Sequence, residues 1–294
     1  MSHDLALAST VALPPGDWQT VRAYLCERFA HVARATWDER FAAGLVRDAD
    51  GVALHPDAPF RPGLVVRYWR ELAHEPPIEG TEEVIYRDEE ILVADKPPFL
   101  PVAPVGAWVE QTLLRRLQRR LGLHSLAPMH RLDRATAGLV LFSVNPANRG
   151  AYHALFRQRA VDKTYRAIAP PLAAQSFPLV RRSRLVRGEP FFRVREVDGE
   201  ANAETHINVL ARRADRWLYE LRPVTGHTHQ LRVHMAALGA PIDGDVYYPD
   251  LRADGADDVT RPLGLLAQRL RFADPVTGSA RDFSTRRTLS LPSA

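Results

Sequence analysis

The sequence has little cysteine, little lysine and no long hydrophobic run. A single cysteine, Cys26, excludes an internal disulfide framework and any zinc site that needs two or more cysteines. No apolar segment approaches the roughly 20 residues that a membrane-spanning helix requires. The first residues also lack the basic start of a secretory signal. We therefore expect a cytoplasmic protein with no membrane partner.

The scarcity of lysine gives the chain an unusual basic surface. Of the 39 basic residues, all but Lys96 and Lys163 are arginine. A genome rich in G and C would explain this bias and the abundant alanine. The planar guanidinium groups nevertheless suit phosphates and base edges. The arginines form three local clusters, which indicate either a solvated face or a polyanionic partner. The clusters are Arg115-Arg116 with Arg119-Arg120, Arg181-Arg182 with Arg184 and Arg187, and Arg212-Arg213 with Arg216.

The length of 294 residues, with 46% hydrophobic and 25% charged residues, is typical of a folded chain of about two domains. We expect residues 1–80 to form a small α/β module of two helices and a hairpin. Asp17 is expected to cap the first helix, and Thr36 with Glu39 to form a capping box for the second. Asp50-Gly51 is typical of a hairpin turn. A linker within residues 74–80 would separate this module from a second domain at 81–294.

The second domain is expected to be β-rich. Strands are predicted at 83–86, 91–94, 139–144, 165–169, 205–210 and 217–221, and helices at 109–121 and 229–238. Because strands dominate with few helices between them, we predict an α+β fold with a large mixed or antiparallel sheet and flanking helices.

Potential catalytic chemistry is densest at His130-Arg-Leu-Asp-Arg134. Asp133 follows Arg131 and precedes Arg134, and nearby guanidinium groups favour an ionised carboxylate. Such a carboxylate is a candidate nucleophile or base. The alternative is a structural Asp–Arg pair that supports a loop.

A second concentration of polar residues runs from Thr225 to His234, followed by Pro241-Ile-Asp-Gly-Asp245. If Thr228 caps a helix, Arg232 lies near its first turn, where an anion such as Asp133 would be held well. The histidines at 227, 229 and 234 suggest a metal, but their spacing matches no HExxH or HxHxDH pattern. We therefore expect no metal, and helix-start or packing roles for these side chains.

Two further segments contain the only lysines. Lys163 and Tyr165 lie two residues apart, so on a strand they share a face. Tyr165 could stack on a base or belong to the core. Lys96 lies in Asp95-Lys-Pro-Pro98, where a strand meets a rigid turn.

These segments, in this order, resemble the RluA branch of the pseudouridine synthases over about residues 83–290. The motifs that carry the resemblance are Asp95-Lys-Pro-Pro, His130-Arg-Leu-Asp133 with Thr136 and Gly138-Leu139, Lys163-Thr-Tyr165, Thr225-Gly226 with Thr228-His-Gln-Leu-Arg-Val-His234, and Pro241-Ile-Asp-Gly-Asp245 with Tyr247 or Tyr248. The resemblance implies the pseudouridine-synthase fold and isomerisation of uridine to pseudouridine in tRNA or large-subunit rRNA, with no cofactor and no metal. We expect a monomer. The N-terminal module loosely resembles the small RNA-binding domain of ribosomal-protein type.

The resemblance also implies roles for single residues. Asp133 would be the essential catalytic aspartate, Tyr165 would lie against the target uracil, and Arg232 would pair with the aspartate. Arg131 would fill the gap left by the displaced nucleotide. Further RNA contacts are expected from His130, Arg134, Thr136, Lys96, Lys163 and His227. The chain departs from the family pattern at Ala137, His227, Gln268 and Asp274, where the family usually has serine, arginine, histidine and histidine.

Two other functions are weighed against this one. An RNA-binding protein with the same fold but no turnover would fit the changed positions at His227 and Gln268. A hydrolase could use the histidines with a metal, or pair Asp133 with Asp245 as a glycosidase does.

Overall fold

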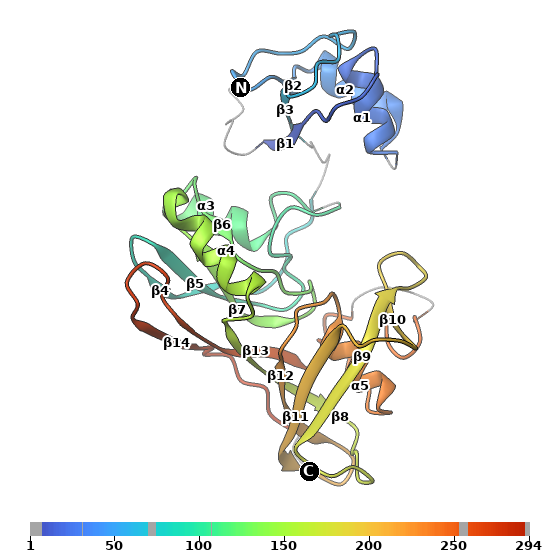
Figure 1. Ribbon diagram of the computed structural model, residues 1–294, viewed down its shortest axis with the longest axis vertical. Helices are drawn as coiled ribbons and strands as arrows, with labels where there is room; N and C mark the ends of the chain where they lie inside the picture. The colour runs from blue at the N-terminus through green and yellow to red at the C-terminus, as the bar shows by residue number, and fades with distance from the viewer. Residues whose placement is uncertain (1–7, 31, 70–74, 107, 253–257, 292–294) are drawn as a thin grey trace. The chain divides into compact units, whose positions relative to one another are not determined.

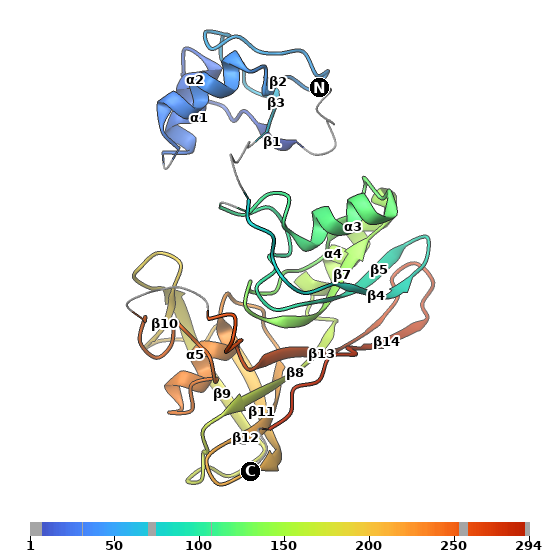
Figure 2. The same ribbon diagram turned by 180° about the vertical axis from the view of Figure 1, so that it is seen from behind.

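A computed structural model describes residues 8–30, 32–69, 75–106, 108–252 and 258–291. The chain forms two compact units, Met1–His74 and Glu75–Ala294, shown from opposite sides in Figures 1 and 2. The first unit ends where the predicted linker begins. No helix in the described parts of the chain is both long and apolar enough to cross a membrane.

The first unit has two helices and a three-stranded antiparallel sheet in the order β1-β3-β2. Its elements are β1 (Ser9–Ala12), α1 (Val21–Arg28), α2 (Arg34–Ala42), β2 (Val46–Arg47) and β3 (Val65–Tyr68). The helix caps differ from the predicted ones. The Thr20 hydroxyl, not Asp17, accepts the N–H of Ala23 at the start of α1. Helix α2 begins before Thr36 and has no side-chain cap, so the predicted capping box is wrong.

The second unit is built on an eleven-stranded sheet with the order β10-β9-β11-β12-β8-β13-β7-β5-β4; β14 pairs with β13, and β6 with β7. Its strands are β4 (Glu83–Arg87), β5 (Ile91–Lys96), β6 (Ala127–Pro128), β7 (Ala137–Ser143), β8 (Asp162–Ala169), β9 (Leu179–Arg187), β10 (Val194–Val197), β11 (Ala203–Arg212), β12 (Trp217–Pro223), β13 (Leu265–Ala273) and β14 (Ala280–Ser284). The β13–β7 pair is parallel and the other pairs between described strands are antiparallel. The prediction of an α+β fold around a large mixed sheet is confirmed.

Three α-helices, α3 (Leu113–Leu121), α4 (Arg149–Arg157) and α5 (Gln230–Ala237), accompany this sheet, and the 3-10 turn η2 (Pro146–Asn148) leads into α4. Leu117 of α3 packs on the face of β5 and β7 that includes Phe142, whereas Tyr152 of α4 packs on the opposite face with Leu141. Strand β7 is therefore covered on both faces, which explains its continuous apolar run. Met235 of α5 packs in the other half of the sheet, against residues of β8, β11 and β12.

Candidate active site

The segment 130–136 leads into β7 and carries Asp133. The N–H of Thr136 donates to the Asp133 carbonyl oxygen at 3.1 Å, which closes a turn immediately before the strand. His130 Nε2 accepts the N–H of Leu141 at 3.1 Å, and its ring stacks on Phe156 at 4.8 Å. Burial, together with the charge of Lys163, lowers the pKa of His130 to about 3. The imidazole is therefore neutral and anchors the start of the segment to β7.

Gly138 fixes the other end of this segment. Its φ is +111°, and an added Cβ would lie 2.3 Å from the Ala267 carbonyl oxygen of β13. A glycine is required because the parallel strands β7 and β13 approach too closely for a side chain. Asp133 is thereby held five residues from the junction of the two halves of the sheet.

Lys96 supports the segment 130–136 through a hydrogen bond to the Arg134 carbonyl. Its ammonium is fully buried and donates to three carbonyl oxygens, those of Pro97 at 3.0 Å, Leu100 at 2.7 Å and Arg134 at 2.9 Å. Burial lowers the pKa of Lys96 well below its ordinary value, and the Asp133 charge partly opposes this. The Lys96 ammonium has no exposed surface for the predicted RNA contact, and its hydrogen bonds hold the turn that follows Asp133.

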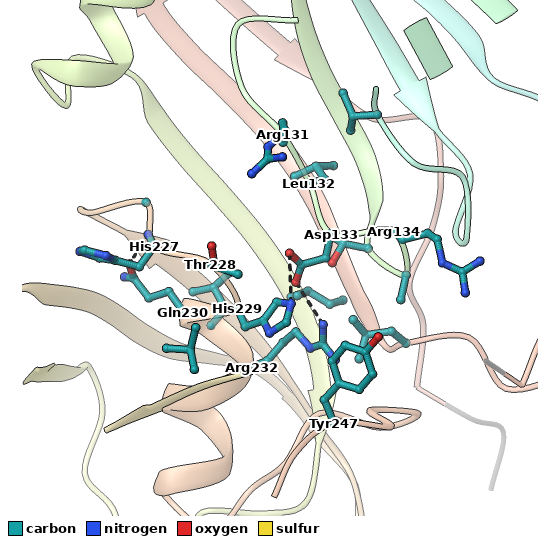
Figure 3. A pocket seen from close by; sticks show the side chains of 18 of the residues that line it. Arg131, Leu132, Asp133, Arg134, His227, Thr228, His229, Gln230, Arg232 and Tyr247 are labelled. Atoms are coloured by element: carbon teal, nitrogen blue, oxygen red, sulfur yellow. Dashed lines mark hydrogen bonds and ion pairs between the residues drawn. The ribbon is translucent and has the colours of Figure 1, made fainter. Parts of the chain in front are cut away.

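Asp133 faces Arg232 of α5 (Figure 3). Arg232 Nη1 lies 3.2 Å from Asp133 Oδ2, while its Nε and Nη2 bind both oxygens of buried Asp245 at 2.8 and 2.7 Å. Burial alone would lower the pKa of Arg232, but these hydrogen bonds and the Asp133 charge raise it above its ordinary value. Arg134, the next residue in the sequence, points away from the Asp133 carboxylate in Figure 3. The cation beside the carboxylate thus comes from a residue 99 positions further along the chain.

Asp245 and two tyrosines hold Arg232 in place. The N–H groups of Tyr247 and Tyr248 donate to Asp245 Oδ1 at 2.8 and 3.1 Å. The guanidinium lies over the Tyr247 ring at 4.9 Å and the Tyr248 ring at 5.4 Å. A guanidinium with two carboxylates and two aromatic rings around it cannot rotate away from Asp133 without losing several contacts.

His229 completes the surroundings of the aspartate. It is the residue before α5, with a left-handed φ of 54°, so the predicted N-cap at Thr228 is wrong. Its Nε2 lies 3.8 Å from Asp133 Oδ1, and its Nδ1 lies 2.9 Å from the Tyr248 hydroxyl. Burial lowers the pKa of His229, although the Asp133 charge works in the opposite direction.

Asp133, Tyr165, Lys163 and Arg232 all line one pocket of about 960 Å³. Tyr165 lies on β8 between Leu221 and Ala267 of the neighbouring strands. Burial, and then the charge of Asp133, raise the pKa of Tyr165, so its phenol is neutral near pH 7. Lys163 shares this face of β8, and its Nζ donates to the Thr225 carbonyl at 3.3 Å. Burial lowers its pKa, as does the charge of Arg159.

The pocket is strongly cationic. Among the described lining residues, nine side chains are arginine or lysine and two are aspartate. The cationic residues are Arg131, Arg134, Arg157, Arg159, Lys163, Arg187, Arg193, Arg232 and Arg261. Only Arg187 belongs to one of the clusters noted in the sequence. In the 115–120 cluster, Arg116 and Arg120 pair with Glu82, so that cluster mainly ties α3 to the segment before β4.

The remaining residues predicted to bind RNA differ in their exposure to solvent. Arg131 is exposed at the pocket, and Arg134 lies over the Trp108 ring at 5.5 Å. Thr136 is almost fully buried. His227 is exposed, and its Nε2 lies 2.9 Å from the Asn202 carbonyl oxygen.

The three histidines that suggested a metal do not converge. His227 contacts Asn202, His229 contacts Asp133 and Tyr248, and buried His234 lies between the hydroxyls of Thr205 and Ser183. Across the described residues, no three His, Cys, Asp or Glu side chains form a group that could hold a metal ion.

Asp274 and Gln268, two residues at which the chain departs from the family pattern, make contacts outside the pocket. The buried carboxylate of Asp274 accepts from the Tyr152 hydroxyl at 3.0 Å and from Arg281 at 2.8 Å, so it ties α4 to β14. The Gln268 carbonyl accepts the N–H of Thr285 at 3.0 Å. Neither residue lines the pocket that contains Asp133.

Comparison with known families supports the resemblance seen in the motifs. Residues 90–237, about half of the chain, match the family described as RNA pseudouridylate synthase. Most residues that line the pocket of Asp133 and Arg232 lie within this matched segment, on the mixed sheet described above. The chain belongs to this family, whose members are intramolecular isomerases acting on RNA uridine.

Similar proteins place the chain near RluA. It is 33% identical to the dual-specificity RNA pseudouridine synthase RluA of Haemophilus influenzae, over 73% of this chain and 97% of that protein. An uncharacterized RNA pseudouridine synthase of Synechocystis is 31% identical over 76% of this chain and 78% of its own length. The mitochondrial tRNA pseudouridine(32) synthase of Saccharomyces cerevisiae is 32% identical, over 60% of this chain and 39% of its own.

A solved structure shares the fold. Human RNA pseudouridylate synthase domain containing 1 superposes with a TM-score of 0.59 at 25% identity, covering 73% of this chain and 86% of that one. The pseudouridine-synthase fold expected from the motifs is confirmed.

Proposed function

We propose that this protein isomerises a uridine of a structured tRNA or large-subunit rRNA, with Asp133 as the catalytic carboxylate. The observation that carries the proposal is the contact of Asp133 with Arg232, 3.2 Å apart, in a pocket lined by nine cationic side chains of the described chain. The cations suit the phosphates of a polynucleotide, and the carboxylate suits a sugar carbon that becomes positive.

The reaction requires one bond to break and another to form on the same nucleotide. The bond from uracil N1 to ribose C1′ breaks, the base turns, and a bond forms from uracil C5 to C1′. The proton at C5 leaves and N1 gains one, so atoms and electrons balance without any added group. The Asp133 carboxylate stabilises the positive character at C1′, because an anion close to that carbon lowers the energy of the separated state.

Other residues hold the reactants. Arg232 orients the Asp133 carboxylate through its hydrogen bond, while Asp245 prevents the guanidinium from moving. Burial and the Asp133 charge raise the pKa of Tyr165, so its phenol is neutral near pH 7 and its ring can support the uracil by contact.

A base enters such a pocket only after it leaves its stack, at a cost of a few kcal/mol. Arg131, which is exposed and lies two residues before Asp133, would fill the vacated position and offset part of that cost. The yeast relative's name ties that protein to tRNA, which supports tRNA as one substrate class here.

Replacement of Asp133 tests the proposal. On tRNA and rRNA from cells that lack the endogenous enzyme, we expect Asp133→Asn to form pseudouridine at least ~1,000-fold more slowly than the wild type. The matched control is Asp162→Asn, which removes an exposed carboxylate outside the pocket and should retain wild-type activity. Equal rates for Asp133→Asn and wild type would refute the role of Asp133. A wild-type protein that binds RNA and forms no pseudouridine would favour a binding protein without turnover.

A further inference from the structure

The loop between β9 and β10 exposes an aromatic side chain to solvent. Phe191 is 85% exposed, the highest value among the large hydrophobic side chains that the structure describes, and its neighbour Phe192 is 37% exposed. Figure 1 shows the loop at the free end of the β9–β10 hairpin, in yellow. An exposed phenylalanine gains nothing from the fold, since its apolar area stays in water.

A series of aromatic rings connects this loop with the catalytic aspartate. Phe191 and Phe192 are 5.6 Å apart between ring centroids, and Phe192 is 5.2 Å from Tyr247. Tyr247 lies 5.6 Å from His229 and beneath the guanidinium of Arg232. Both phenylalanines line the pocket that contains Asp133. Phe191 is therefore the outermost ring of a continuous series that ends at the reacting site.

The loop is held in position by the same segment that holds Arg232. The Val194 N–H donates to the Tyr248 hydroxyl at 2.8 Å, and Arg193 donates to the Pro249 carbonyl at 2.7 Å. The Gly188 N–H donates to the Arg193 carbonyl at 2.9 Å and closes the hairpin. The exposed ring is thus presented on a fixed support, which lowers the entropy lost when a ligand binds it.

The charges beside the ring identify its ligand. Arg187 and Arg193 flank the loop at the ends of the two strands, and both line the pocket. A solvent-exposed aromatic face beside guanidinium groups fits an unpaired nucleobase with its attached phosphates, because bases stack on such rings regardless of sequence.

We propose that Phe191 stacks on an unpaired nucleobase next to the target uridine and helps to hold the RNA in its opened conformation. This inference rests on the proposed function, since the ligand is the same RNA. Phe191 is a binding residue at the mouth of the site and takes no part in the bond changes at C1′.

The test compares Phe191→Ala, Phe191→Leu and Phe191→Trp. The probes are total tRNA and total rRNA from cells lacking the enzyme, with Kd from filter binding and KM and kcat from pseudouridine formation. We expect Phe191→Ala and Phe191→Leu to raise Kd and KM about 10-fold with kcat unchanged, as loss of one base–aromatic stack does. Phe191→Trp should bind like the wild type. Val276→Ala, a 45% exposed side chain outside the pocket, is the matched control and should change nothing.

Salt dependence separates stacking from charge. Phe191→Ala should leave the slope of log Kd against log salt unchanged, whereas Arg187→Ala should reduce it by about one phosphate contact. Wild-type Kd for Phe191→Ala, or for Phe191→Leu, would overturn the stacking role. Kd does not depend on turnover, so weaker binding by both variants would support stacking even if no pseudouridine formed. A lack of pseudouridine formation by the wild type would refute only the proposed function.

Discussion

At the scale of single residues, the site depends on where one cation is placed. Arg232 donates one hydrogen bond to Asp133 and two to Asp245. The Asp245 carboxylate therefore fixes the position of the guanidinium. A lysine there could not make this forked contact. The two carboxylates share one guanidinium, and the one that faces the pocket is Asp133.

His130 gives the stability of the second unit a specific pH dependence. Its pKa is about 3 in the folded protein, lowered by burial, against about 6.5 when unfolded. The folded state therefore keeps a neutral imidazole while the unfolded state gains a proton, so stability falls as the pH drops below 6.5. At pH 5 we expect His130 to cost about 2 kcal/mol of the free energy of unfolding.

Urea denaturation at a series of pH values checks this expectation. His130→Gln keeps an acceptor for the Leu141 N–H but cannot titrate, so its stability should depend less on pH between 6.5 and 5. His153→Gln alters an exposed histidine of α4 and should keep the wild-type dependence. Parallel curves for wild type and His130→Gln would contradict the prediction.

At the scale of elements, the junction of β7 with β13 positions the segment that carries Asp133. Gly138→Ala should destabilise the second unit by about 3 kcal/mol or more, because the new Cβ meets the Ala267 carbonyl and the backbone must keep a φ of +111°. Thermal and urea unfolding measure the change. Gly150→Ala in α4 is the control: its Cβ meets nothing within 4 Å, so helix propensity should stabilise the protein slightly. Equal stability of the two variants would show that the strands can separate at Gly138.

The elements show which parts of the fold the sequence could predict. The apolar run of β7 and the pair β4–β5 were predicted because a buried strand has a strong hydrophobic signal. Strand β9 was missed: arginines occupy most of its outward positions, and its inner residues contact others far along the chain. The start of α5 was misplaced because His229 adopts a left-handed φ, which no side-chain preference signals.

The site was predictable only in part for a related reason. Motifs named Asp133, Tyr165 and Arg232, and these residues do line one pocket. Arg157 and Phe191 carry no local signal, because they reach the pocket from a helix and a loop that meet only after folding. Lys96 was assigned to RNA because its burial is not visible in a short polar motif.

At the scale of the molecule, cations from segments far apart in sequence collect at one pocket. If about four of them contact phosphates, log Kd for RNA should change with log salt with a slope of about 4, and affinity should fall about 100-fold between 50 and 200 mM salt. Filter binding of total tRNA at several KCl concentrations measures the slope. Arg119→Ala, whose guanidinium pairs with Glu110 outside the pocket, should leave it unchanged. A flat response would mean that the lining arginines do not meet the RNA backbone.

The buried ammonium of Lys96, next to the turn that follows Asp133, also bears on the composition of the chain. Its three hydrogens meet three carbonyl oxygens in a space that a flat, five-donor guanidinium would overfill. An arginine in place of Lys96 would break the packing around the turn, because the ammonium is fully buried. The geometry of three converging carbonyl oxygens therefore accounts for a lysine at this position in a chain whose other basic residues are nearly all arginine.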